Sequence, residues 1–226
     1  MVTRFYLVRH AEAEGNAKEF FQGSTETLLT EKGKQQLQYL SERFRIIPLD
    51  AVISSPFGRA RQTAEAINLH HKLPILTEYD LREINGGDWE GRPWTELPEA
   101  FPEAYADWTD AMWRFQAPNG EPMGQVWNRM TAVMERLARD HKGQTVAVAS
   151  HGCALRNFLC FVEFCDMERL ADVGWADNTA VSLVEYDDES GWRLIFKNDA
   201  SHLPKECSTL RRSHWCRYET AKEENT

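Results

Sequence analysis

The feature that most constrains the fold of this chain is a series of short apolar segments separated by longer amphipathic ones. Residues 143–152, GQTVAVASHG, consist mainly of small and β-branched residues without polar alternation. That pattern is typical of a parallel strand that is covered on both faces. We expect four strands before the last quarter of the chain, at residues 5–8, 50–56, 73–78 and 143–152.

Amphipathic segments connect these strands. Thr30 is suited to the N-cap of a helix, and a second helix is predicted where Ala60, Ala64 and Ile67 share one face. Residues 178–199, NTAVSLVEYDDESGWRLIFKND, are typical of two strands around a polar turn. The sequence therefore predicts a three-layer α/β/α sandwich whose central sheet is mostly parallel, with one antiparallel pair.

An aromatic segment interrupts this alternation. Five of the eight tryptophans lie between Trp89 and Trp127, and apolar residues recur there at spacings of three and four. Pro98 and Pro102 must break or bend any helix in this region. We expect a helical insertion over the site, with most aromatic side chains packed on the domain and a few lining a ligand pocket.

Composition excludes several classes of partner. The net charge is −9, from 26 basic and 35 acidic residues, so duplex DNA and anionic membranes are not expected partners. The five cysteines are scattered without a C-x-x-C pair, which argues against both a disulfide framework and a zinc site. No apolar run approaches the ~20 residues of a membrane span, and no signal peptide is recognisable. A cytoplasmic location is expected.

Charged residues follow several of the predicted strands. Arg9 and His10 end the first strand, Arg59 and Glu83 follow the second and third, and His151 ends the fourth. Ligands of open parallel α/β sheets bind outside the carboxyl ends of the strands. We therefore expect these five residues to meet in one crevice, although up to 142 positions separate them along the chain.

This set of residue types fits phosphoryl transfer. A histidine such as His10 can attack phosphorus and form a phosphohistidine. Arg9 and Arg59 can neutralise phosphate oxygens without a metal, and His151 can donate to an oxygen of the transition state. Glu83, kept protonated by burial, can protonate the leaving oxygen.

Four segments together resemble the histidine phosphatase superfamily, in the branch that contains cofactor-dependent phosphoglycerate mutases and many small-molecule phosphatases. They are LVRHAEAEGN, SSPFGRARQTAEAI, LREINGGDWEG and ASHGCALR, at residues 7–16, 54–67, 81–91 and 149–156. The resemblance extends from about Thr3 to Leu203. It implies a phosphoglycerate mutase-like fold and a histidine phosphatase domain at residues 1–204, followed by a C-terminal extension at 205–226.

The resemblance also implies substrate-binding residues. Asn16 stands at the place of the asparagine that follows the first signature. FQGSTETLLTEKGKQQ, at residues 21–36, resembles the loop and helix in which Gln22 and the Gly23 backbone line the pocket. No metal and no cofactor are implied.

The chain departs from the family pattern at four places. Ala11 replaces the usual glycine and Ala13 a hydroxyl residue, which we interpret as tuning of the pocket. Gly86 stands where an aromatic residue is common, and Pro122 replaces a serine that often caps the next helix. Proline is compatible with a first helical turn. All five catalytic-type positions are retained.

The sequence thus predicts a histidine phosphatase-type phosphomonoesterase, a metal-independent hydrolase of small phosphomonoesters that works through a phosphohistidine. A phosphoglycerate mutase-type transferase and a non-catalytic sensor of a phosphorylated ligand are the alternatives. Residues 84–115 hold only Arg92 and Arg114 as cations against seven acidic residues, which suits a less anionic or bulkier ester. The expected partner is a small phosphorylated metabolite, and no oligomeric state is indicated.

Overall fold

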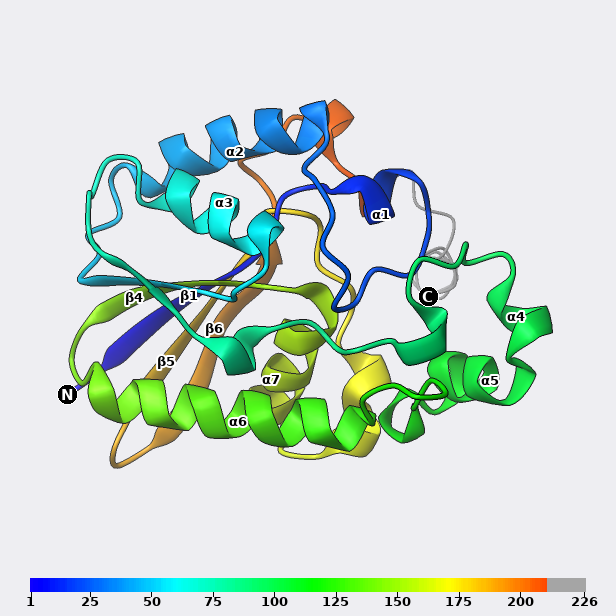
Figure 1. Cartoon of the computed structure of the whole chain (residues 1–226). Coiled ribbons are helices and arrows are strands. Elements are labelled where there is room, and N and C mark those ends of the chain that lie inside the picture. Colours follow the sequence, from blue (N-terminus) through cyan, green and yellow to red (C-terminus); the bar gives the residue numbers. More distant parts are fainter. Residues whose placement is uncertain (211–226) are drawn as a thin grey trace.

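Six strands form one sheet in the computed structural model, which describes residues 1–210 (Figure 1). They are β1 (Thr3–Arg9), β2 (Ala51–Ser54), β3 (Ile75–Thr77), β4 (Thr145–Ser150), β5 (Val181–Asp187) and β6 (Gly191–Asp199). Their order across the sheet is β3-β2-β4-β1-β5-β6. The first four strands are parallel to one another, whereas β5 runs antiparallel to both β1 and β6. The predicted, mostly parallel sheet with a late hairpin is confirmed.

Helices cover both faces of this sheet (Figure 1). The α-helices are α1 (Glu14–Ala17), α2 (Glu31–Phe44), α3 (Gly58–Ile67), α4 (Leu97–Ala100), α5 (Pro102–Asp110), α6 (Met123–Asp140) and α7 (Gly152–Phe164). The 3-10 helices are η1 (Tyr79–Leu81), η2 (Gly87–Trp89), η3 (Met112–Arg114), η4 (Met167–Asp172) and η5 (Lys205–Cys207). Within residues 1–210, none of these helices has both the length and the apolar character needed to cross a bilayer.

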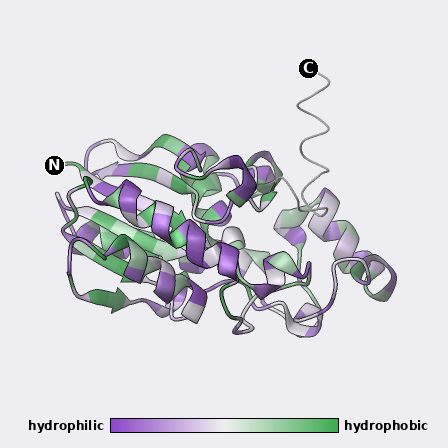
Figure 2. Ribbon diagram, turned by 90° about the horizontal axis from the view of Figure 1, so that it is seen from above, coloured by the Kyte–Doolittle hydropathy of each residue, from purple (hydrophilic) through white to green (hydrophobic). Residues whose placement is uncertain are grey.

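The core has two parts, one on each face of the sheet. Val8 of β1 packs with Leu40 and Phe44 of α2 on one face. Phe5 and Leu7 of the same strand face the opposite way, into the larger cluster built with α6 and α7. Alternating β1 side chains thus bury both faces, as a covered parallel strand requires. Figure 2 shows that the strands are largely hydrophobic and that the helices carry many hydrophilic residues. With helices on both faces of the sheet in Figure 1, the three-layer sandwich is confirmed.

The aromatic segment forms the predicted helical insertion. Pro98 and Pro102 each stand in the first turn of a short helix, α4 and α5, where a missing N–H is tolerated. Pro122 occupies the N-cap of α6, and the helix persists for 18 residues. The prolines therefore divide the segment into short helices instead of preventing helix formation.

The first residues of the predicted C-terminal extension pack on the domain. Gln36 of α2 donates to the Cys207 carbonyl at 2.8 Å, and the Thr209 hydroxyl donates to Glu12 at 2.9 Å. The Thr209 amide donates to Asp177, and Thr209 itself is buried. The remainder of the extension, 211–226, lies outside the described residues.

Gly33, in the first turn of α2, allows this helix to approach the loop after β1 closely. A Cβ at Gly33 would lie 2.1 Å from the Glu12 carbonyl oxygen, which is a backbone clash. A Cβ at Gly124, in the first turn of α6, would meet nothing within 4 Å. We expect Gly33→Ala to lower the free energy of unfolding by about 1–3 kcal/mol. Gly124→Ala should leave it unchanged or raise it by up to about 1 kcal/mol. Chemical denaturation measures both, and equal effects would contradict the close approach.

Candidate active site

The register of β1 and β4 brings two histidines together. Arg9 is the partner of Ser150 in the parallel ladder, and the His10 amide donates to the Ser150 carbonyl at 2.9 Å. His10 directly follows β1 and His151 directly follows β4, so both lie at the same end of the parallel strands. Their ring centroids are 5.2 Å apart, and both side chains are buried. This confirms that the strand ends converge.

The protonation of His10 follows from its surroundings. Its Nδ1 lies 2.8 Å from the Ala11 carbonyl oxygen, which can only accept, so Nδ1 carries the proton of the neutral ring. Nε2 is then unprotonated. Burial lowers the pKa of His10 well below its usual value, and the charges of Arg59 and Arg9 lower it further. His10 thus has a neutral ring whose Nε2 can act as a nucleophile.

His151 is held by a hydroxyl group of the next strand. Its Nε2 lies 2.6 Å from Ser55 Oγ, directly after β2, and its Nδ1 has no hydrogen-bond partner among residues 1–210. Burial lowers the pKa of His151 well below the usual value, with smaller contributions from Arg59 and His10. When Ser55 donates to Nε2, the neutral ring carries its proton on Nδ1, where it can donate to a ligand.

The two arginines differ in their setting. Arg59, in the first turn of α3, is fully buried and donates to the carbonyls of Gly23 at 2.6 Å and Thr25 at 2.8 Å. Burial lowers the pKa of Arg59 to about 10, so it stays charged at neutral pH. Arg9 donates to the Ala176 carbonyl and lines the cleft described below. The positive field of the site therefore comes from two side chains on different elements.

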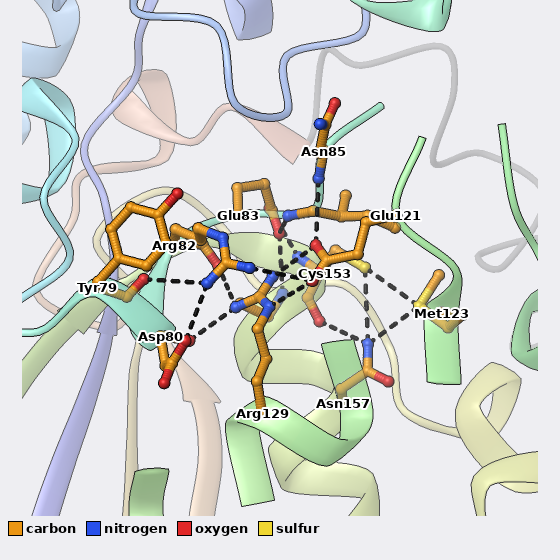
Figure 3. A network of polar contacts seen from close by, with 12 residues as sticks. Tyr79, Asp80, Arg82, Glu83, Asn85, Glu121, Met123, Arg129, Cys153 and Asn157 are labelled. Atoms are coloured by element: carbon orange, nitrogen blue, oxygen red, sulfur yellow. Dashed lines mark hydrogen bonds and ion pairs between the residues drawn. The ribbon is translucent and has the colours of Figure 1, made fainter. Parts of the chain in front are cut away.

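Glu83 lies at the N-terminus of α7. One carboxylate oxygen accepts from the Cys153 amide at 2.9 Å, and the other accepts from the Ala154 and Ile84 amides at 3.0 and 2.9 Å (Figure 3). Burial nevertheless raises the pKa of Glu83 above its usual value, because desolvation outweighs these hydrogen bonds and the charge of Arg59. The carboxyl group is thereby biased toward the protonated form that an acid needs.

An ion-pair network supports the segment that carries Glu83 (Figure 3). Arg129 of α6 pairs with the buried Glu121 at 2.7 Å and donates to the carbonyls of Asp80 and Arg82, each at 2.7 Å. From β4, the Ser150 hydroxyl donates to the Leu81 carbonyl at 2.7 Å. These contacts fix the backbone just before Glu83 from two sides, and sequence reasoning did not find them.

These residues surround a cleft that is open to solvent. Five of the expected site residues line it: Arg9, His10, Asn16, Gln22 and Glu83. The other three, Arg59, His151 and Gly23, are buried and are not among the lining residues. The N–H of Gly23 donates to Glu90 and its carbonyl accepts from Arg59, so both backbone groups of this residue are engaged.

Asn16 and Gln22 are held by local contacts. Asn16 Oδ1 accepts from the Ala13 amide at 3.1 Å, which supplies the cap of the short helix α1. Gln22 Oε1 accepts from the Gly15 amide at 2.9 Å and from the Thr27 hydroxyl at 2.6 Å. Both amide side chains are thus oriented by the loop that forms this wall of the cleft.

Three further residues position the histidines. The side-chain amide of Asn178 donates to the His10 carbonyl at 2.8 Å, and Thr63 Oγ1 accepts from the Ala11 amide at 3.0 Å. Ser55 holds His151, as described above. Ser55 and Thr63 belong to the sequence motif around Arg59, so this motif could have identified them as candidate site residues. Asn178 lies 168 positions from His10 in sequence, and no local pattern marks it.

The described residues offer no group of three or more histidine, cysteine or acidic side chains that could hold a metal. Cys153, directly after the His-Gly pair, is buried, and desolvation raises its pKa well above the usual value. Cys153 is therefore a small buried residue whose thiol stays protonated. The polar groups of the cleft are therefore histidine, arginine, amide and carboxyl groups.

Glu90 holds the loop of residues 23–25, which also contacts Arg59. Its carboxylate accepts from the amides of Gly23, Ser24 and Thr25 at 3.1, 2.7 and 3.2 Å, and from that of Gly86 at 2.8 Å. The same loop provides the two carbonyls that accept from Arg59. Glu90 therefore acts on Arg59 through the loop, and the sequence did not single it out.

We expect Glu90→Gln to weaken this loop, because an amide NH₂ cannot accept from the backbone donors. The free energy of unfolding should fall by about 1–3 kcal/mol, and kcat/KM for a phosphomonoester by roughly tenfold. Glu96→Gln is the matched control, since this exposed carboxylate lies in the same segment. Chemical denaturation and steady-state kinetics measure the two effects. Unchanged stability and turnover in the Glu90 variant would contradict the role of the loop.

Several known proteins are similar to this chain over most of its length. The chain is 30% identical over 203 residues to phosphoserine phosphatase 1 of Hydrogenobacter thermophilus, covering 89% of this chain and 95% of that protein. It is 32% identical over 208 residues to the probable phosphoglycerate mutase GpmB of Escherichia coli, covering 88% and 94%. The solved structure of Bacillus stearothermophilus YhfR superimposes with a TM-score of 0.84 at 30% identity, covering 88% and 98%.

These similarities confirm the expected phosphoglycerate mutase-like fold. The relatives include proteins named as phosphatases and proteins named as mutases. The sequence profile of the histidine phosphatase superfamily (branch 1) matches residues 5–200. The chain belongs to the histidine phosphatase superfamily.

Proposed function

We propose that this protein is a metal-independent phosphatase that hydrolyses small phosphomonoesters through a phosphohistidine at His10. The observation that carries the proposal is the composition of one cleft, which is lined by the His10 nucleophile, the buried acid Glu83 and the cation Arg9. The nucleophile must be a neutral histidine, whereas the acid must be a protonated glutamic acid. Both forms are well populated at one pH when the environment lowers the pKa of the histidine and raises that of the glutamate. Burial lowers the pKa of His10 and raises the pKa of Glu83.

In the first half of the reaction, His10 Nε2 attacks phosphorus and forms an N–P bond. The P–O bond to the leaving alcohol breaks, and its electron pair remains on oxygen. Glu83 gives its proton to that oxygen, so the alcohol leaves neutral and Glu83 becomes a carboxylate.

In the second half, a water molecule attacks the phosphohistidine. Glu83 takes a proton from the water while the new P–O bond forms, and the N–P electron pair returns to His10. Inorganic phosphate leaves, and both side chains recover their starting protonation states. Arg9, Arg59 and the Nδ1–H of His151 stabilise the charge on the equatorial phosphoryl oxygens in both halves.

The two alternatives are less well supported. A sensor needs neither an acid nor a buried nucleophile, yet both are present. A mutase needs cations to hold a second acidic group of its substrate, but the cleft lining among residues 1–210 contains only one arginine and no lysine. We therefore assign the protein a small phosphorylated metabolite as substrate and water as the final acceptor.

The phosphohistidine assignment predicts a labelled intermediate. Rapid mixing with a ³²P-labelled aryl phosphate in excess chelator should leave label on the protein that is acid-labile and base-stable. His10→Ala should lose both label and turnover, because no other residue is expected to form the N–P bond. His141→Ala is the control, since that side chain is exposed and bonded to Gln144. Label persisting in His10→Ala, or a strict need for a divalent ion, would refute the proposal.

The pKa shifts predict the pH profile. kcat/KM rises with pH as His10 loses its proton, and this limb lies below the usual histidine range because the pKa of His10 is lowered. It falls as Glu83 ionises, and this limb lies above the usual glutamate range because the pKa of Glu83 is raised. We expect an optimum on the acid side of neutral.

Glu83→Gln should remove the alkaline limb of this profile. It should lower turnover of an alkyl phosphate by roughly 10²–10³-fold and that of a nitrophenyl phosphate by less than about tenfold, since only the alkyl leaving group needs a proton. Stopped-flow and steady-state kinetics across pH measure both quantities. An equal loss for the two esters would argue against Glu83 as the acid.

A further inference from the structure

Aromatic rings form much of the apolar lining of the cleft. Five aromatic residues line the cleft: Phe20, Phe21, Trp94, Trp108 and Trp175. The last four are connected by ring contacts and are called here the aromatic wall. Phe21 follows α1, Trp94 precedes α4, Trp108 belongs to α5 and Trp175 follows η4. Distant segments thus contribute to one apolar surface beside the reacting groups.

The aromatic wall is a connected set of ring contacts. Trp108 lies 5.7 Å from Phe21, 5.6 Å from Trp94 and 5.9 Å from Trp175 between ring centroids, and it is nearly parallel to Trp175. Behind it, Phe115 is fully buried and contacts Trp108 at 4.7 Å. Rings supported in this way are preorganised, and they bind a flat apolar group with little loss of side-chain entropy.

Few cations line the cleft beside the aromatic wall: among residues 1–210, the lining contains one arginine, Arg9, and no lysine. Arg92 donates to the Asp88 carbonyl at 2.8 Å and lies over Phe101, while Arg114 lies over Trp113. Arg156 lies 4.5 Å from the ring of Trp175, but it donates to the Val173 carbonyl and does not line the cleft. Among residues 1–210, the charged groups that line the cleft are Arg9 and Glu83, and His10 lines it as well.

A carboxylate on the alcohol part of the substrate would therefore meet aromatic rings and the acid Glu83. Its desolvation would be uncompensated, because an unpaired charge in an apolar site is costly. An uncharged ring would instead exchange water for contact with Trp108 and its neighbours. The charged groups and the aromatic rings of the lining thus suit different ends of one substrate.

We propose that the substrate is a phosphomonoester whose alcohol carries an uncharged aromatic group, which binds against the aromatic wall. This inference rests on the proposed phosphatase function and specifies its substrate class. It excludes the class of small phosphorylated acids, which includes phosphoglycerate and phosphoserine, as preferred substrates.

The first test compares esters of primary alcohols, so that leaving-group basicity stays similar. The full-length chain should hydrolyse 2-phenylethyl phosphate with a kcat/KM at least about tenfold above those for 3-phosphoglycerate and O-phosphoserine. Equal values, or a preference for either acid, would overturn the inference while leaving the phosphatase proposal intact.

The second test uses matched tryptophan variants. Trp108→Ala should lower kcat/KM for 2-phenylethyl phosphate by roughly tenfold and that for 3-phosphoglycerate by less than about twofold. Trp113→Ala is the control, because this tryptophan does not line the cleft. Trp108→Leu keeps an apolar side chain without a ring, so it separates the loss of the aromatic face from a loss of packing. An equal loss for both esters in the Trp108 variants would contradict the inference.

A binding measurement makes the inference independent of turnover. By calorimetry, benzylphosphonate should bind the wild-type protein at least about tenfold more tightly than phosphonoacetate, which carries a carboxylate in place of the ring. If no ester is hydrolysed, the phosphatase proposal fails, and these two affinities alone decide the substrate class. Equal affinities would refute it.

Discussion

The parallel pairing of β1 with β4 is the constraint on which the site depends. Arg9 is the partner of Ser150, and the hydrogen bond from the His10 amide to the Ser150 carbonyl continues the ladder by one residue. A slip of one residue would exchange the two faces of a strand that is buried on both sides. The two core clusters therefore fix the register, and the register fixes the distance between the two histidines.

Burial then sets the protonation states of the two histidines and of Glu83. The same exclusion of water lowers the pKa values of His10 and His151 and raises that of Glu83. Arg59 reinforces the effect on the histidines but opposes it on Glu83, so desolvation dominates at the acid. A site built on strand ends beneath an aromatic insertion can thus keep a neutral nucleophile and a protonated acid together. The cost of burying them is offset by hydrogen bonds to backbone groups.

Much of this arrangement could be predicted because it is local in sequence. Apolar runs ending in Arg9-His10 and Ser150-His151 identify strands with polar ends, and the topology of parallel sheets places such ends at one edge. Pro98 and Pro102 likewise reveal where the helical insertion is divided. Asn178 could not be found in this way, because its contact with His10 depends on how β5 enters the sheet beside β1.

Periodicity and short motifs were sufficient to predict the fold class, the family and the charged residues at the strand ends. The division of these residues between the cleft and its support follows from tertiary packing. The backbone of Gly23 donates to Glu90 and accepts from Arg59. Trp108 lines the cleft, whereas Trp113 does not. Tryptophans five positions apart on one segment look alike in sequence. Their directions are set by packing against distant residues, here Phe21 and Trp175, which no local pattern encodes.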